Sequence, residues 1–428
     1  MFITQLNIEN FKSIAHIEMN FTPLTILVGA NASGKSNLIN VFRFISDIAT
    51  DGIDNAIAMQ GGIPYLTNAS LPKGTPIKIS FTIDLTNEGW IRSSNVKNIA
   101  LEIHEIKYQF IIQPNIKGGG YHIVIDNLEL GFECMRINSS AKRENLYTPM
   151  NIKYSLIFER KSQKSSISYD CYMDDNCPID EESKIKLKND ITAQVFARIC
   201  NENRKELMLY RAAILLPSFF SEDTFIRIFD FDPKELKKSS SMASMRILEE
   251  NGSNIASVLQ NILRLKENRK KLTVILNEYL PFIDAITIEN NFDKSFSYKV
   301  KESFSNREFH ANFLSDGTVS LLAIVIALYF EEMSNIIILE EPERNIHPKL
   351  LAKILASAED ISFEKQVIIT THNPEFLKHA KIEDVKLIQR NTEGFTLASV
   401  PTDSETIKCF LRNDLGLDDL FLQGILGE

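Results

Sequence analysis

The stretch Gly29-Ala-Asn-Ala-Ser-Gly-Lys-Ser36 decides how the rest of the chain is interpreted. It fits the pattern G-x-x-x-x-G-K-[ST], in which backbone N–H groups surround phosphate, the lysine reaches the β- and γ-phosphates and the last hydroxyl binds Mg²⁺. The aliphatic run Leu24–Val28 predicts a buried strand before the loop, and the residues from Ser36 to about Ile48 predict a helix after it. This order of elements brings a phosphate to a helix N-terminus. We therefore expect an α/β protein with a phosphate-binding loop (P-loop).

A second stretch, Ile336-Ile-Ile-Leu-Glu-Glu-Pro-Glu343, lies near the other end of the chain. Its four aliphatic residues predict a buried strand with Glu340 and Glu341 at its carboxyl end, where ligands bind in open α/β sheets. One carboxylate that holds a metal beside one that polarises water is what phosphoryl transfer to water requires. A solvated acidic strand end is the alternative interpretation.

Composition limits the class of protein. The length of 428 residues allows two or three domains, and the formal net charge of -9 gives no support for a strongly basic nucleic-acid binder. The first residues lack the pattern of a signal peptide, and no apolar run approaches the roughly 18 residues of a membrane span. The five cysteines are scattered without a C-x-x-C pair, so we expect reduced thiols in a cytoplasmic protein.

Periodicity predicts the remaining elements. Strands are expected at Phe2–Phe11 and Ala15–Phe21, mostly β structure at 78–172, helices at 181–210 and 245–279, and β structure at 285–312. Ser239–Ser244 is expected to be a linker, and Asp232 is expected to cap a helix that begins at Pro233. From Leu314 onward, alternating β and α segments predict a largely parallel sheet.

Five motifs occur along the chain in a fixed order: Leu6-x-Ile8-x-Asn10-Phe-Lys-Ser13, the P-loop, Leu314-Ser-Asp-Gly-Thr318, Glu340-Glu-Pro-Glu343 and Thr370-Thr-His372. This set resembles the ABC-type ATPases of the SMC/RecF group, especially the compact branch with OLD-family and PtuA-like defence ATPases. The resemblance implies an ABC-type P-loop NTPase head, a mixed β-sheet with flanking helices plus a small antiparallel sheet, with an inserted β/helical lid. It divides the chain into the first half of the head at 1–75, the lid region at 76–310, and the second half of the head with the tail at 311–428.

The resemblance also implies roles for single residues, with ATP and Mg²⁺ as cofactors. Lys35 would be catalytic and Glu341 the general base, His372 would sense the γ-phosphate, and Ser36 and Glu340 would hold Mg²⁺. Ser315 and Gly317 resemble the signature motif, which in the family completes the site of the opposite subunit, so a head-to-tail dimer around two ATP molecules is implied. The expected nucleotide contacts are Gly29, Asn31, Ser33, Gly34, Lys35, Ser36, Asn37, Lys12, Ser315 and Gly317.

The chain departs from the family pattern at three places. Asp316 stands where the family usually has glycine, and Gln60 is the only candidate for the Q-loop glutamine. Arg344-Asn-Ile-His347 occupies the D-loop position without the usual aspartate, and His347 is either a D-loop contact or a helix cap. Lys12 is either a phosphate contact or a solvated lysine at a strand end.

The leading functional hypothesis is an ATP-hydrolysing switch that dimerises on ATP and acts in antiphage defence or DNA repair, with DNA or a separately encoded effector protein. A basic run is either a solvated helix face or a surface for DNA or a partner, and it comprises Arg264, Lys266, Arg269, Lys270 and Lys271. A non-hydrolysing, nucleotide-dependent scaffold is the main alternative. An OLD-type nuclease is disfavoured because only about 45 residues follow Lys381, fewer than a typical domain. The amphipathic segment Ile407–Leu426 either docks on the core or binds a partner.

Overall fold

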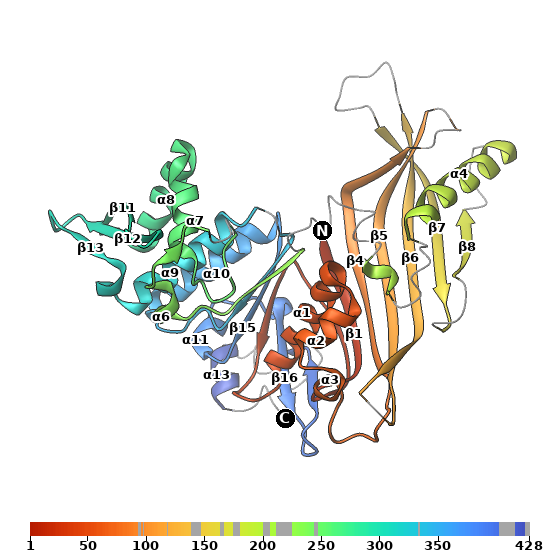
Figure 1. The fold of residues 1–428 in the computed structure, drawn as a ribbon, viewed down its shortest axis with the longest axis horizontal. Coiled ribbons are helices and arrows are strands. Elements are labelled where there is room, and N and C mark those ends of the chain that lie inside the picture. Colours follow the sequence, from red (N-terminus) through yellow and green to blue (C-terminus); the bar gives the residue numbers. More distant parts are fainter. Residues whose placement is uncertain are drawn as a thin grey trace. The chain divides into compact units, whose positions relative to one another are not determined.

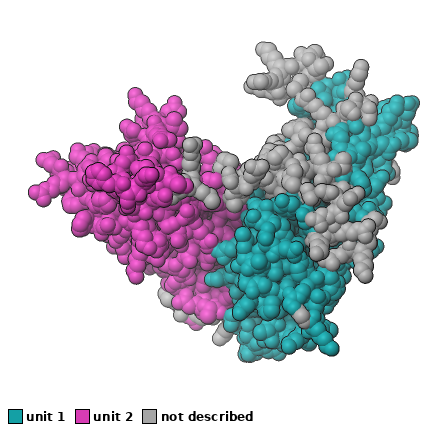
Figure 2. Space-filling view, viewed as in Figure 1, with its two compact units in different colours: residues 1–21, 36–225, 389–398 teal, residues 22–35, 226–388, 399–428 magenta. Residues whose placement is uncertain are grey.

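The computed structural model describes residues 1–92, 96, 98–117, 119–137, 147–162, 167–173, 180–199, 206–210, 225–243, 247–332, 334–401 and 416–423 (Figure 1). The chain forms two compact units, each assembled from segments that are distant in sequence (Figure 2). Unit 1 comprises residues 1–21, 36–225 and 389–398, and unit 2 comprises residues 22–35, 226–388 and 399–428. The assignment of 1–75, 76–310 and 311–428 to head, lid and head stays a prediction about the roles of these segments.

Unit 1 contains a sheet with the strand order β8-β7-β6-β5-β4-β1-β2-β17. Neighbouring strands are antiparallel except for β17, which pairs with β2 in parallel. The strands are β1 (Phe2–Phe11), β2 (Ile14–Asn20), β4 (Ile77–Arg92), β5 (Ile99–Pro114), β6 (Tyr121–Ile137), β7 (Tyr147–Arg160), β8 (Ser168–Met173) and β17 (Thr396–Ser399). Alternation of buried and accessible side chains, as along the second half of β5, confirms the predicted period of two.

The helix that begins at the end of the P-loop packs against the strands of this sheet. Unit 1 has the helices α1 (Lys35–Asp51, from Ser36 onward), α2 (Ile53–Met59), α3 (Ile63–Leu66) and α4 (Glu181–Ile199). The ring of Phe42 on α1 meets Phe21 edge-on with centroids 5.5 Å apart, and Phe44 lies 5.8 Å from Phe11. These aromatic contacts hold α1 against the strands that precede it in sequence.

Unit 2 contains a parallel run of strands in the order β16-β3-β15-β14-β9. They are β3 (Leu24–Val28), β9 (Ile226–Phe229), β14 (Ile336–Glu340), β15 (Gln366–Thr371) and β16 (Val385–Arg390). All residues of β3 and β15 are buried, as expected for parallel strands covered on both faces. The parallel arrangement predicted after Leu314 is confirmed, and β9 adds a strand that the sequence did not indicate.

The other elements of unit 2 surround this run. Its helices are α6 (Pro233–Leu236), α7 (Ile255–Arg264), α8 (Lys266–Tyr279), α9 (Asp316–Tyr329), α10 (Pro348–Ser362), α11 (Pro374–Leu377) and α13 (Leu417–Leu422), with 3₁₀ turns at Ala311–Phe313 and Ile382–Asp384. A small antiparallel sheet contains β10 (Ser240–Ser241), β11 (Ile283–Asn290), β12 (Ser295–Glu302) and β13 (Glu308–His310). The predicted cap of α6 is confirmed, because Asp232 accepts a hydrogen bond of 2.9 Å from the backbone N–H of Lys234.

One local expectation is wrong. Ser239–Ser244 was expected to be a linker, but Ser240 and Ser241 form β10 and pair with β12. The Ser240 hydroxyl is buried and donates to the carbonyl oxygen of Ser253, so pairing with β12 and this buried hydrogen bond fix the serine run as a strand.

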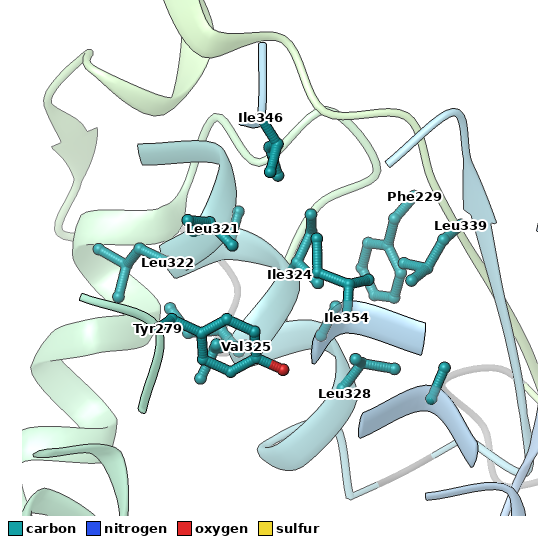
Figure 3. Close-up of a cluster of buried hydrophobic side chains, with 14 of the residues drawn as sticks. Phe229, Tyr279, Leu321, Leu322, Ile324, Val325, Leu328, Leu339, Ile346 and Ile354 are labelled. Atoms are coloured by element: carbon teal, nitrogen blue, oxygen red, sulfur yellow. The ribbon is translucent and has the colours of Figure 1, made fainter. Parts of the chain in front are cut away.

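The core of unit 2 forms around α9, which is buried at every position from Val319 to Leu328. Figure 3 shows Ile324 of α9 beside Phe229 of β9 and Ile354 of α10, while Leu321 and Leu322 lie on the other side of the helix. Of the amphipathic C-terminal segment, residues 416–423 are described, and Leu417 and Leu420 are buried in this core, which favours docking for that part. Within the described part of the chain, no helix is long and apolar enough to cross a membrane.

Candidate functional site

Three parallel strands of unit 2 end at the same level. Val28 at the end of β3 is paired with Thr371 of β15, and Glu340 at the end of β14 is paired with Thr370. The P-loop, the turn that begins at Glu341 and the segment that begins at His372 therefore leave the sheet at one edge. Ligands of open parallel sheets bind at this carboxyl edge.

The P-loop backbone requires its glycines. A Cβ atom on Gly29 would lie 2.2 Å from the carbonyl oxygen of Ile388, and Gly34 has φ of 108°. Ala32 is also in the left-handed region, with φ of 64°, which fits the strain that functional loops carry. The buried hydroxyl of Ser33 has no hydrogen-bond partner among the described residues.

Lys35 is buried, with 6% of its surface exposed. Its ammonium group donates hydrogen bonds of 2.7 Å to the carbonyl oxygen of Gly29 and 3.0 Å to that of Ala30. Burial lowers the pKa of Lys35, and the negative charges of the acidic turn, that of Glu341 first, raise it without reversing the shift. The P-loop lysine and the acidic end of β14 therefore share one electrostatic environment.

Glu341 begins a strained turn. Its φ is 42°, and its backbone N–H donates to the carbonyl oxygen of Thr370 at 3.0 Å. Its Oε1 lies 3.0 Å from Nδ1 of His372, and its Oε2 accepts a hydrogen bond of 2.9 Å from Nε of Arg344. Burial alone would raise the pKa of Glu341, but Arg344 and His372 outweigh it and hold the pKa below its ordinary value.

The predicted signature residues lie at the N-terminus of α9. The Ser315 hydroxyl caps the helix by accepting from the backbone N–H of Thr318 at 3.2 Å. A Cβ atom on Gly317 would lie 2.6 Å from the carbonyl oxygen of Asn345, so glycine is required there. Asp316, which departs from the family pattern, forms an ion pair of 2.5 Å with Lys237.

Comparison with known proteins gives the family. A model of the AAA ATPase domain matches residues 1–377, most of the chain. The chain belongs to the AAA ATPase domain family. A stretch of 101 residues is 28% identical to the DNA replication and repair protein RecF of Paenarthrobacter aurescens (strain TC1), covering 22% of this chain and 25% of that protein. The match thus spans only a quarter of the length of this curated relative.

The chain is also similar to solved structures, and the match with a TM-score of 0.53 gives the fold. An SMC head bound to the C-winged helix domain of ScpA has a TM-score of 0.53 at 13% identity, covering 93% of this chain and 98% of that one. An SMC head with an extended coiled coil, bound to the C-terminal domain of ScpA derived from Pyrococcus furiosus, has a TM-score of 0.48 at 12% identity, covering 96% and 99%. Together with the family model and the RecF stretch, the first match identifies this AAA ATPase domain as SMC/RecF-like, with an ABC-type P-loop head.

Three residues of this AAA ATPase domain that were not assigned to the site from the sequence lie in the strained turn or contact it. Glu343 is 6% exposed, accepts a hydrogen bond from the Thr371 hydroxyl and has a pKa raised by burial. Arg344 joins Glu341 to Asp230, which follows β9. Glu343 and Arg344 lie beside the motif and were within reach of sequence analysis, whereas no local pattern indicates Asp230.

Other predicted contacts of the AAA ATPase domain belong to unit 1. Lys12 has φ of 49°, and its ammonium group donates a hydrogen bond of 2.9 Å to Oε1 of Gln60. Asn37, in the first turn of α1, donates from Nδ2 to the Ser13 hydroxyl at 2.6 Å. Ser36 follows Lys35 as the second residue of α1. The nucleotide roles of these residues stay predictions.

Hydrogen bonds bear on the alternatives for His347 and for the basic run. His347 caps α10, because its Nδ1 accepts from the backbone N–H of Lys349 at 3.2 Å. In the basic run, Arg269 donates to the carbonyl oxygen of Leu263, and Lys271 donates to that of Tyr329 at 2.9 Å. These two cations thus have structural contacts, while all five side chains of the run remain exposed.

The acidic edge has donor atoms suited to Mg²⁺. Among the described residues, no group of three or more His, Cys, Asp or Glu is arranged to hold a metal. A Mg²⁺ ion that accompanies a nucleotide needs only one or two protein oxygens, since phosphate and water complete its shell. The partly buried carboxylate of Glu340, at the end of β14, is an oxygen donor of this kind.

Proposed function

We propose that this protein binds Mg-ATP and hydrolyses it to ADP and phosphate. The observation that carries the proposal is that Lys35 and Glu341 share one edge of the parallel sheet, close enough for the carboxylate to act on the lysine electrostatically. A cationic phosphate-binding loop beside a carboxylate is the minimum that transfer of a phosphoryl group to water requires.

Each group has a role in this proposal. The backbone N–H groups of Gly29–Gly34 and the ammonium group of Lys35 bind the β- and γ-phosphates. Ser36 and Glu340 would hold Mg²⁺, which would neutralise charge on the phosphates. Glu341 accepts the proton of the attacking water, and His372, 3.0 Å from Glu341, contacts the γ-phosphate.

We further propose that two copies pair head to tail around two ATP molecules. The N-terminus of α9 supports this, because Ser315 and Asp316 are exposed and a helix N-terminus attracts phosphate. The stretch that is similar to the DNA replication and repair protein RecF supports work in DNA repair, with DNA or an effector protein. Antiphage defence is the alternative context, and it is supported by the resemblance of the five motifs to defence ATPases.

Nucleotide binding, hydrolysis and solution mass test the proposal together. Lys35→Ala should lose ATP binding, because the cation that meets the phosphates is removed. Glu341→Gln should bind ATP, hydrolyse it at least about 100-fold more slowly and double its mass with Mg-ATP, since a missing general base blocks turnover. Lys301→Ala removes the cation of an exposed pair with Asp284 and should behave like the wild type.

Different failures have different meanings. Wild-type ATP affinity in Lys35→Ala would contradict the assignment of the P-loop. Bound ATP without hydrolysis by the wild type would favour a nucleotide-dependent scaffold. If Glu341→Gln hydrolysed ATP and stayed monomeric with bound ATP, the role of Glu341 as general base and the proposed dimer would both be contradicted.

A further inference from the structure

One oxygen of the Glu341 carboxylate accepts a hydrogen bond, and the other lies near a histidine nitrogen. Nε of Arg344 donates to Oε2 at 2.9 Å, and Nδ1 of His372 lies 3.0 Å from Oε1. The side chain is only 17% exposed, so its lone pairs have little access to water. A carboxylate that already accepts a charge-assisted hydrogen bond is a poorer acceptor for the proton of a water molecule.

Arg344 is held between two carboxylates. Its Nη1 donates to Oδ1 of Asp230 at 2.6 Å, while its Nε faces Glu341. Its backbone N–H donates to the carbonyl oxygen of Glu341 at 3.1 Å, so both residues belong to one tight turn. The residues at the two ends of this turn, Glu341 and Asn345, have φ of 42° and 63°.

The turn therefore sets where the guanidinium group lies. Arg344 comes three residues after Glu341, and left-handed conformations on both sides of it are maintained only where surrounding contacts enforce them. The side chain of Arg344 remains 46% exposed, so it can move without unpacking the core. Asp230 lies at the end of a neighbouring parallel strand and competes with Glu341 for the same cation.

We propose that Arg344 is a positioning residue that restrains Glu341, and that Asp230 limits this restraint by sharing the guanidinium group. With Arg344 in place, Oε2 of Glu341 is occupied and hydrolysis is slower than the carboxylate could support. Without Asp230, Arg344 has one carboxylate fewer and binds Glu341 more strongly. This inference rests on the proposed ATPase activity.

Steady-state ATP hydrolysis by the full chain tests the restraint. Arg344→Ala should raise kcat roughly two- to fivefold, the factor that corresponds to one partly exposed ion pair, with KM for ATP unchanged. Arg344→Lys should give an intermediate kcat, because an ammonium group cannot bind both carboxylates as a fork. Asp230→Asn should lower kcat, and Arg344→Ala combined with Asp230→Asn should equal Arg344→Ala alone.

Two controls separate the restraint from a structural role. Lys301→Ala breaks the Lys301–Asp284 pair, which has similar exposure, and should leave kcat unchanged. Arg344→Ala in a Glu341→Gln background should give no gain, which would show that Arg344 acts through Glu341. Thermal unfolding identifies a variant that fails to fold, and Arg344→Gln, which keeps most of the side-chain stem, then replaces Arg344→Ala.

The outcomes distinguish this inference from the proposed function. If the wild type hydrolyses ATP and both Arg344→Ala and Arg344→Gln have an equal or lower kcat, the restraint is overturned and the ATPase remains. A fall in kcat for Arg344 and Asp230 variants alike would mean that the pair only stabilises the turn, which also overturns it. Bound ATP without hydrolysis in the wild type and every variant would contradict the ATPase and the restraint together.

Discussion

The Thr371 hydroxyl donates a hydrogen bond of 2.5 Å to Oε1 of Glu343, and this bond joins the end of β15 to the turn after β14. The backbone N–H of His372 approaches the same oxygen at 3.4 Å. The other oxygen, Oε2, is buried without a hydrogen-bond partner among the described residues. Glu343 is thus a buried carboxyl group that is only partly satisfied.

The first prediction concerns the stability of this carboxyl group. Burial raises the pKa of Glu343 above the unfolded value, so the folded state binds a proton more readily than the unfolded chain. The burial of the ionised carboxylate therefore lowers the free energy of unfolding. This loss is complete above the pKa that Glu343 has in the folded state, and it disappears below the pKa that Glu343 has in the unfolded chain. Glu343→Gln should therefore stabilise the fold at neutral and alkaline pH by about 1 kcal/mol, the lower end of the cost of an unsatisfied buried polar group.

Thermal unfolding from acid to alkaline pH measures this effect. The stability difference between Glu343→Gln and the wild type should shrink as the pH falls. Glu375→Gln, a carboxyl-to-amide change at an exposed position of α11, provides the matched control with little change. If Glu343→Gln were less stable than the wild type at neutral pH, the predicted cost of the buried carboxylate would be contradicted.

The second prediction concerns Lys237 and Asp316. The 2.5 Å ion pair balances a negative charge at the N-terminus of α9, where the proposed partner's phosphate would approach. Lys237→Ala, made in the Glu341→Gln background, should weaken the Mg-ATP-dependent dimer roughly two- to fivefold, the range expected for a partly exposed pair. Adding Asp316→Asn should restore the affinity, because the uncompensated charge is removed.

The dimer dissociation constant, measured by sedimentation with Mg-ATP, decides this prediction. Lys238 is the matched control, since its pair with Glu235 lies beside Lys237 in sequence but involves no residue of α9. An equal loss of dimer affinity in Lys238→Ala would show that any nearby positive charge has this effect, which would contradict a specific role for the pair of Lys237 with Asp316.

The sequence was sufficient for the segments whose chemistry is local. Leu24–Val28, the P-loop and α1 were predicted because an aliphatic strand, a glycine-rich turn and a helical period follow one another without interruption. Ile336–Glu340 was predicted for the same reason, since its aliphatic run ends abruptly in carboxylates. These local patterns also determine the family.

Contacts between distant segments could not be predicted in this way. Arg344 and Asp230 are 114 residues apart, and they meet because β9 lies parallel to β14. The four residues of β9, Ile226–Phe229, are too few to show a period, so neither the strand nor Asp230 at its end was expected. The ion pairs that join Glu341, Arg344 and Asp230 therefore depend on the order of the strands in the sheet.

The third prediction concerns Gly317. Alanine in place of a helical glycine usually stabilises a protein, but a Cβ atom here would lie 2.6 Å from the backbone oxygen of Asn345. Gly317→Ala should therefore destabilise the fold by about 1–3 kcal/mol, the cost of overpacking. Gly119→Ala, where a Cβ atom would meet nothing within 4 Å, is the control in chemical unfolding. Equal stability of the two variants would show that the turn at Asn345 yields to the added methyl group.

The fourth prediction concerns the ion pair of Asp126 and Arg160 in unit 1, whose side chains are 0% and 4% exposed. The Tyr108 hydroxyl donates to Oδ1 of Asp126 at 2.6 Å, and the backbone N–H of Met208 donates to Oδ2 at 3.1 Å. The network thus connects β5, β6 and β7 to the segment 206–210.

Asp126→Asn should lower the unfolding free energy by about 3–5 kcal/mol, because the buried guanidinium group is left without its counter-charge. Asp126→Leu combined with Arg160→Met should cost less than the single change, since removing both charges also removes their desolvation penalty.

Urea unfolding gives these free energies, and hydrogen exchange at Met208 should become faster in Asp126→Asn. Glu182→Gln breaks an exposed pair with Lys186 and should cost no more than about 1 kcal/mol. If Asp126→Asn cost no more than this control, the pair would not be what holds residues 206–210 on the sheet.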